Sequence, residues 1–138
     1  MSIVNERGNE YIINIGNVPV EQYVSHYVID NHIVVFTYYT TTPIGENTTY
    51  HINSIYRIDI NEPNSPIKTT LYTNGDLKIR PEHPLEFTSY YEAEGVIKLY
   101  WVDGVNQLRF MNIMETYTNP NDFNTTPELQ LEEEVKVE

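Results

Sequence analysis

Apolar and β-branched residues occur along this chain in short runs, and clusters of Asn, Gly and Pro interrupt them about every ten residues. Examples of such runs are Ile33 to Tyr39, Ile52 to Ile60 and Lys68 to Tyr72. Short runs rich in Tyr, Ile, Val and Thr and bounded by turn residues are typical of β-strands. No stretch has the apolar spacing of a strong helix, so the pattern predicts an all-β chain.

The clearest local signature is a hairpin around the only tryptophan. Val96 to Val102 and Gln107 to Ile113 have strand composition, and Asp103-Gly104 is a dipeptide that tolerates the positive φ angles of a tight turn. A structural hairpin is one interpretation, and a contact with a ligand or partner is the other. The candidate interface or structural residues are Tyr100, Trp101, Asp103, Gly104, Asn106, Gln107 and Arg109.

Three side chains of this hairpin carry specific expectations. Tyr100 and Trp101 are neighbours in a strand, so they should point to opposite faces, with one ring buried and the other partly in water. The guanidinium of Arg109 could pair with Asp103 across the hairpin or with a carboxylate of a neighbouring chain.

Two parts of the chain can be aligned with each other. Ser25 to Phe36 corresponds to Ser89 to Tyr100, and Tyr56-Arg57-Ile58 corresponds to Leu108-Arg109-Phe110. Repeats of three or four strands match the blades of a β-propeller. The predicted division is 1–19 as an N-terminal arm or first strand, 20–76 as a first blade-like unit, 77–84 as a Pro-containing linker, 85–114 as a second blade-like unit, and 115–138 as a linker and acidic C-terminal arm.

Two blade-like units cannot close a propeller, which typically has about four to eight blades. Two units would give a wedge with open strand edges and an exposed inner channel face. The pattern therefore predicts that this chain is part of a larger β-propeller-type assembly, completed either by further subunits or by the rest of a longer polypeptide.

The residues of the hairpin also carry a resemblance. Tyr100 to Ile113, preceded by Glu82-His83-Pro84 and Ser89-Tyr90-Tyr91, resembles the blade repeat of the large tail protein of crAss-like bacteriophages, called the stabilisation or muzzle protein. Tyr27 to Thr37 and Ile55 to Ile60 resemble the same family, in which a proline usually stands where this sequence has Leu108. The resemblance implies a non-enzymatic structural component of a virion tail, assembled in the host cytoplasm, whose partners are other tail subunits or the remainder of a larger polypeptide.

The charge balance argues against nucleic-acid binding through a basic surface. The formal net charge is −12, with 20 acidic residues against eight scattered Lys and Arg, whereas proteins that grip phosphates do so with clustered cations. An acidic surface can serve solubility, or it can repel DNA, as a conduit for DNA would require. There is no apolar run of about 18 residues, so no membrane contact is expected.

Catalytic signatures are missing from the sequence. The four histidines lack metal-ligand spacing, there is no cysteine, and neither a Gly-x-Ser-x-Gly elbow nor a glycine-rich phosphate loop occurs. No catalytic, metal or cofactor-binding residue is therefore predicted. Two alternatives to a structural protein remain. One is a glycan- or receptor-binding β module, suggested by Trp101 and by outward-facing rings among the 12 tyrosines. The other is a glycosidase-like propeller enzyme, which would need two carboxylates about 5–10 Å apart.

The last stretch, Glu128 to Glu138, alternates acidic and apolar residues. Its apolar positions, spaced mostly by two, could present one face of a strand added to a neighbouring subunit. The other interpretation is a disordered acidic tail. The candidate assembly-arm residues are Leu129, Leu131, Val135 and Val137.

Overall fold

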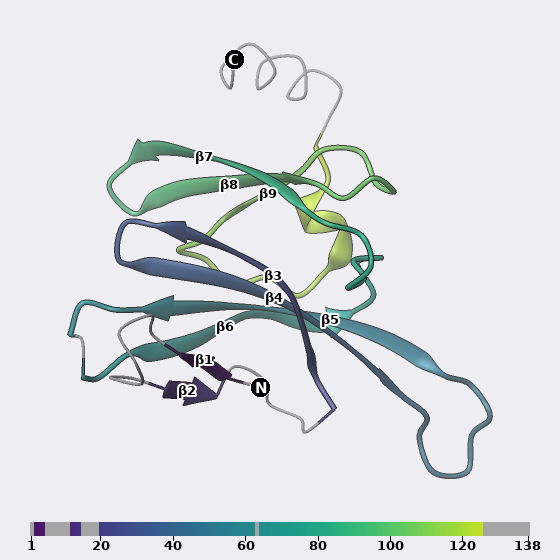
Figure 1. The fold of residues 1–138 in the computed structure, drawn as a ribbon. Coiled ribbons are helices and arrows are strands. Elements are labelled where there is room, and N and C mark those ends of the chain that lie inside the picture. Colours follow the sequence, from purple (N-terminus) through teal and green to yellow (C-terminus); the bar gives the residue numbers. More distant parts are fainter. Residues whose placement is uncertain (1, 5–11, 15–19, 63, 126–138) are drawn as a thin grey trace.

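The computed structural model describes residues 2–4, 12–14, 20–62 and 64–125. Within these ranges, regular structure consists of β-strands in three antiparallel sheets and one short 3₁₀ helix, which confirms the all-β prediction (Figure 1). The elements are β1 Ser2–Val4, β2 Ile12–Asn14, β3 Gln22–Ile29, β4 His32–Thr41, β5 Tyr50–Asp59, β6 Ile67–Gly75, β7 Glu86–Ala93, β8 Val96–Val102, β9 Arg109–Asn112 and the 3₁₀ helix Pro120–Phe123.

The largest sheet is a four-stranded meander in the order β3-β4-β5-β6. Its first hairpin turns through Asp30-Asn31, and Ile29 pairs directly with His32. Asp30 has φ 51, a left-handed conformation that Asp tolerates better than most residues. β4 and β5 continue to the pair Thr41–Tyr50, beyond the last residues that β3 and β6 cover, so this end of the hairpin projects from the sheet (Figure 1).

The second sheet is a three-stranded meander in the order β7-β8-β9. Its tight two-residue turn is Glu94-Gly95, where Gly95 has φ 78. The prediction of a tight turn at Asp103-Gly104 is wrong, because β8 ends at Val102 and β9 begins only at Arg109. Gly104 does have the positive φ expected of it, 80, but within a longer loop.

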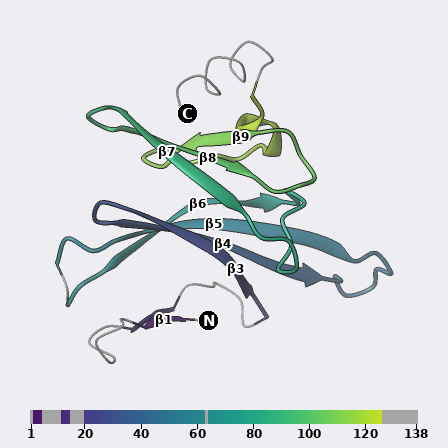
Figure 2. The ribbon, with the colours of Figure 1, turned by 45° about the horizontal axis from the view of Figure 1, so that its top comes forward.

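The two large sheets stack face to face, and the main core lies between them (Figures 1 and 2). From the four-stranded sheet come Val34, Phe36 and Ile55, and from the three-stranded sheet come Leu99 and Trp101. Phe36 meets the edge of Trp101 with ring centroids 5.3 Å apart. Burial of apolar surface at this interface is the main force that holds the two sheets together.

The two sheets contribute opposite faces to this core. When the hairpins are matched at their two-residue turns, Val34 corresponds to Lys98 and Val35 to Leu99. Val34 faces the second sheet, but its equivalent Lys98 does not belong to the core, and Leu99 does. The sheets are therefore stacked head to tail, which means that equivalent faces of the two sheets point in the same direction. The Val34 face of the first sheet packs on the opposite, Leu99 face of the second.

The same register corrects the internal alignment. Val34 pairs with Arg57 in the first sheet, and the equivalent Lys98 pairs with Asn112 in the second. Asn112, not Arg109, is thus the counterpart of Arg57. The predicted match of Tyr56-Arg57-Ile58 with Leu108-Arg109-Phe110 is wrong by three residues, because similar residue types were aligned across loops of different length.

The other face of the four-stranded sheet carries a second apolar cluster. Val35, Tyr56 and Ile58 are buried there, with Ile33 and Ile60 packed against them. The small sheet β1-β2 lies on this side, so three sheets follow one another in space (Figures 1 and 2). In the described part of the chain, no helix has the length and apolar character needed to cross a membrane.

The segment after β9 returns to the core. The amide of Tyr117 donates to the carbonyl of Leu71 at 2.7 Å, and the 3₁₀ helix then inserts Phe123 between the sheets with 0% exposure. Its ring lies 5.2 Å from that of Tyr72 and 5.7 Å from that of Trp101. Although its Thr, Asn, Asp and Pro content suggested a linker, the described part of this segment, up to Thr125, packs on the fold.

Candidate functional site at the junction of the sheets

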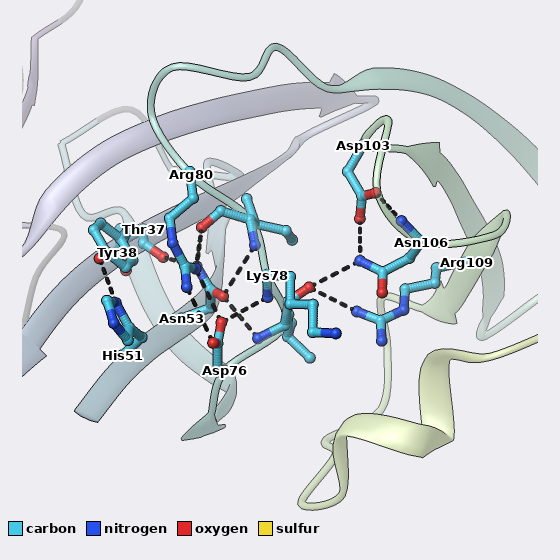
Figure 3. A network of polar contacts seen from close by, with 12 residues as sticks. Thr37, Tyr38, His51, Asn53, Asp76, Lys78, Arg80, Asp103, Asn106 and Arg109 are labelled. Atoms are coloured by element: carbon cyan, nitrogen blue, oxygen red, sulfur yellow. Dashed lines mark hydrogen bonds and ion pairs between the residues drawn. The ribbon is translucent and has the colours of Figure 1, made fainter. Parts of the chain in front are cut away.

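Three of the predicted hairpin residues, Asp103, Asn106 and Arg109, lie where the chain passes from the first sheet to the second (Figure 3). The carbonyl of Leu77, just after β6, accepts hydrogen bonds from Arg109 Nη1 at 3.0 Å and from Asn106 Nδ2 at 3.1 Å. Both donors belong to the second sheet or its β8–β9 loop. The two sheets are thus joined by directional polar contacts as well as by their apolar core.

Asp103 organises the β8–β9 loop. Its Oδ1 accepts from the amides of Val105 at 2.9 Å and Asn106 at 2.7 Å, and its Oδ2 accepts from Asn106 Nδ2 at 2.7 Å. An Asp that bonds the amides following it stabilises a turn. The predicted pairing of Arg109 with Asp103 is wrong, because the carboxylate is taken up by its own loop.

Arg109 lies across from Trp101 in the β8–β9 ladder and is only 8% exposed. Its Nε donates to Asn124 Oδ1 at 3.2 Å, so it also holds the segment that carries Phe123. Burial lowers the pKa of Arg109, an effect that the more distant charge of Asp103 opposes. Asn124 and Arg109 additionally form an isolated antiparallel bridge.

Asn53 on β5 fastens the connecting segment from the other side. Its Oδ1 accepts from the amides of Leu77 at 2.8 Å and Ile79 at 3.4 Å, and its Nδ2 donates to the carbonyls of Thr37 at 3.1 Å and Ile79 at 2.8 Å. Both hydrophobic residues of this segment, Leu77 and Ile79, are fully buried. One amide side chain therefore satisfies backbone groups that burial has removed from water.

An ion pair between Asp76 and Arg80 lies at the surface beside the hydrogen bonds of Asn53 (Figure 3). Asp76 accepts from Arg80 at 2.9 and 3.0 Å, and it also caps the amide of Lys78, whose φ is 64. Burial disfavours the ionised carboxylate of Asp76, but these hydrogen bonds outweigh it and leave its pKa lowered. The Arg80 guanidinium also lies over the ring of Tyr38, 4.5 Å from the centroid.

A second polar contact joins the sheets elsewhere in the interface. Arg57 Nη1 donates to the carbonyl of Ile113 at 2.8 Å, while its Nε and Nη2 bind the carboxylate of Asp59 at 2.9 and 3.2 Å. His32 Nδ1 lies 2.6 Å from the same carboxylate. Burial disfavours ionised Asp59, yet the hydrogen bonds from Arg57 and His32 prevail and lower its pKa.

We expect Asp59→Asn to lower the free energy of unfolding by about 1–3 kcal/mol at neutral pH, because it removes charge-assisted hydrogen bonds that orient Arg57. Since folding lowers the pKa of Asp59, its contribution is present above the unfolded-state pKa and is lost as the pH falls through the folded-state pKa. The variant should therefore lose less stability than the native chain between about pH 6 and pH 3. Urea unfolding at several pH values measures this, with exposed Glu62→Gln as the control; parallel curves for Asp59→Asn and the native chain would contradict it.

The remaining predicted site residues have simple environments. Trp101 and Tyr100 are both buried, so the expectation that one ring would be partly in water is wrong. The ring of Tyr100 stacks on that of Phe110 with centroids 5.6 Å apart, on the face turned away from the first sheet. Gln107 is exposed and lines a pocket beside Arg109. Leu129, Leu131, Val135 and Val137 lie outside the described residues.

Asn53 and Phe123 are the principal residues that the sequence reasoning missed. Asn53 lies in a run interpreted only as a half-buried strand. Nothing in a single sequence distinguishes an Asn that hydrogen-bonds buried backbone groups from an Asn at the surface. Phe123 is the one aromatic residue among the polar residues from Thr118 to Thr126, which was a usable signal for an anchor. Among the described residues, no group of three or more His, Asp or Glu side chains could hold a metal ion.

Comparison with known proteins assigns the chain to a family. A family model described as Crassvirus muzzle protein matches residues 1–138. The chain belongs to the Crassvirus muzzle protein family. The muzzle protein of Bacteroides phage crAss001 is 29% identical over 147 residues, a match that covers 99% of this chain and 10% of that protein. The chain thus spans about a tenth of the length of this muzzle protein, and the resemblance noted in its hairpin is confirmed over the whole chain.

Proposed function

We propose that this chain is a non-enzymatic structural component of a phage virion tail, a segment of the muzzle that acts through protein–protein assembly. Membership of the muzzle protein family supports a structural virion component. In this proposal residues 20–76 and 85–114 are two successive blades of a β-propeller-type assembly, and residues 77–84 join them. The partners are other tail subunits or the remainder of a longer polypeptide.

The observation that carries the proposal is the head-to-tail stacking of the two sheets. Two equivalent hairpins related by a two-fold axis would meet through equivalent faces and close a sandwich. Here Val34 and Phe36 face the second sheet, whereas Leu99, the equivalent of Val35, faces back. A front-to-back contact can be repeated indefinitely, and blades around a propeller axis use this arrangement.

Each end of the stack has features that suit continuation. On the face of the three-stranded sheet that points away from the first sheet, Tyr100 stacks on Phe110, and Lys98 lies 5.6 Å from the Phe110 ring centroid. Lys98 and Tyr100 on β8 occupy the positions of Val34 and Phe36 on β4, and Phe110 on β9 occupies the position of Ile55 on β5. At the other end, β1-β2 fits the last two strands of a preceding unit.

The projecting β4–β5 hairpin suits contact with a neighbouring subunit. Its tip turns through Pro43 and Gly45, with the amide of Glu46 donating to the Pro43 carbonyl at 3.0 Å, and it leaves Ile44 entirely exposed. Glu46 is the only Asp, Glu, Lys or Arg from Thr37 to Ile52. Depletion of charge and exposure of an apolar residue are features of interface cores, and a neutral tip can approach another acidic subunit without strong repulsion.

We expect the purified chain to associate in a concentration-dependent manner, because among the described residues the outer strands β3, β6 and β7 pair with a neighbour on one side only. Sedimentation velocity over a dilution series measures this. Deletion after Pro127 is expected to weaken association, since the predicted assembly arm is lost. A matched control keeps the arm's acidic residues and replaces Leu129, Leu131, Val135 and Val137 with Ser; it should weaken association similarly. A sharp monomer boundary at all concentrations, with one cooperative unfolding transition, would indicate a self-contained sandwich instead.

A further inference from the structure

The two large sheets touch each other directly along one edge of the stack, where β3 of the first sheet lies beside β7 of the second. The ring centroids of Tyr27 and Phe87 are 5.4 Å apart, and Tyr27 Oη lies 3.4 Å from Ser89 Oγ. The ring of Phe87 also lies 5.4 Å from that of Phe36 on β4. Side chains of the two sheets therefore meet without a spacer at this edge.

The opposite edge of the stack holds an additional layer of chain, residues 113–125, between β6 and β9 (Figure 1). Tyr117 is bonded to both strands: its amide donates to the carbonyl of Leu71 on β6 at 2.7 Å, and its hydroxyl accepts from the amide of Asn112 on β9 at 2.8 Å. Beside it, Phe123 is fully buried. The inserted layer holds the sheets farther apart here, so the stack is a wedge that narrows toward β3 and β7.

This taper decides what a repeated head-to-tail contact generates. Units of even thickness that stack front to back form an open column. Wedge-shaped units rotate by a constant angle at each step, and such an arrangement becomes a ring when the rotation closes. In a propeller the blades are arranged in this way around a central channel. The narrow edges of the wedges meet at the axis, and the wide edges lie outside.

The edge strands agree with this orientation. Among the described strands, β3 and β7 each pair on one side only. Exposed strand edges invite pairing with other chains, and Lys, Pro and bulges are common protections. Neither β3 nor β7 contains Lys or Pro, and each has one bulge near an end, so most of each edge is regular. At the wide edge, by contrast, Asn124 bridges to Arg109 of β9. A place at the axis would protect the narrow edge, because converging neighbours leave no room for a further strand.

We propose that β3 and β7 face the central axis of the assembly and that residues 113–125 face its outside. This inference rests on the proposed propeller-type assembly and adds its orientation. The partners are further wedge-shaped units stacked face to face on this chain, and not a strand added to the β3 or β7 edge. The exposed side chains of the inner surface then include Tyr23, His26 and Tyr91, whereas Glu115 and Asp122 are exposed on the outer surface.

Single-cysteine variants of the full chain test the orientation, since the native sequence contains no cysteine. His26→Cys and Tyr91→Cys place a thiol on the narrow edge, and Thr116→Cys is the matched control on the wide edge. All three positions are exposed. Each variant is treated with a large poly(ethylene glycol) maleimide and, separately, with the small reagent N-ethylmaleimide. Labelling rates are measured at a concentration where sedimentation shows association and again after dilution.

We expect the large reagent to label His26→Cys and Tyr91→Cys about tenfold more slowly when about nine-tenths of the chain is associated, because it reaches an axial thiol only in the dissociated fraction. N-ethylmaleimide should label both at the rate seen after dilution, since a channel admits water and small molecules. Thr116→Cys should react with either reagent at the same rate in both samples.

Three labelling patterns would overturn the orientation. Protection of Thr116→Cys together with free reaction of the other two would put the axis at the wide edge. Equal rates at all three positions, whether fast or slow, would mean that association does not distinguish the edges. Protection of His26→Cys or Tyr91→Cys from N-ethylmaleimide as well would indicate a strand of another copy paired directly to that edge.

Sedimentation of the same samples separates this inference from the proposed function. A chain that stays monomeric at every concentration overturns the assembly and the orientation together. Association accompanied by one of the three contrary labelling patterns overturns the orientation alone.

Discussion

Replacing Phe123 with alanine is expected to lower the free energy of unfolding by about 3–5 kcal/mol. The ring is fully buried and touches the rings of Tyr72, Trp101 and Tyr117, so its removal leaves a cavity where the two sheets and the returning segment meet. Urea unfolding followed by Trp101 fluorescence measures the change. Because Trp101 lies beside Phe123, its emission should also move toward the spectrum of a more hydrated indole before unfolding begins.

The matched control is Tyr91→Ala, which deletes an aromatic ring from β7 at an exposed position. Exposed substitutions of this kind typically change stability by less than about 0.5 kcal/mol. Equal and small effects of the two substitutions would mean that residues 113–125 are not part of the cooperative unit. In that case the linker interpretation of this stretch would hold in solution.

The strands themselves were predictable because their residues repeat the same physical signals. Ile33 to Tyr39 is rich in β-branched and aromatic residues and lies within β4, and the Asp30-Asn31 turn falls where a residue tolerant of positive φ is required. The second unit was placed equally well from Val96 to Val102, which coincides with β8. Local propensity and turn chemistry decided these elements, and both can be read from a single sequence.

The stacking direction of the sheets was not predictable from the same signals. Val34 and Val35 are both fully buried, so β4 shows no alternation that would reveal which face meets the second sheet. A strand covered on both sides is apolar at successive positions. The internal alignment failed at Arg57 for a related reason. The sequence contains two arginines in similar strands, but the residues opposite them in the ladders, Val34 and Trp101, occupy different positions of the two units.

The polar junction depends on contacts between residues far apart in sequence. The contact of Asn53 with Leu77 requires β5 and β6 to be paired, and the contact of Leu77 with Arg109 requires the two sheets to be stacked. The hairpin pattern made Arg109 and Asp103 candidate interface residues, and it suggested that they could pair with each other. In the folded chain each satisfies backbone groups instead, because buried amides and carbonyls leave few other partners available.

Asn53→Asp is expected to be among the most damaging isosteric changes in the chain, lowering the free energy of unfolding by about 3–5 kcal/mol at neutral pH. The side chain is 1% exposed, and its Nδ2 faces the carbonyls of Thr37 and Ile79. A carboxylate there cannot donate to either carbonyl, and its charge would be buried beside two oxygen atoms that repel it. Asn64→Asp, the same chemical change at an exposed position, should alter stability by less than about 0.5 kcal/mol.

The pH dependence of the Asn53→Asp variant distinguishes a lost donor from a general packing defect. Burial and the facing carbonyls favour the protonated carboxyl, so folding should raise the pKa of the introduced Asp above its unfolded value. The folded state then binds more protons than the unfolded state, and the stability deficit relative to the native chain shrinks as the pH falls through the folded-state pKa. Chemical denaturation of both chains between about pH 7 and pH 4 measures the deficit. A deficit that is constant with pH would show that position 53 matters for its shape and not for the hydrogen bonds that fasten the connecting segment to the first sheet.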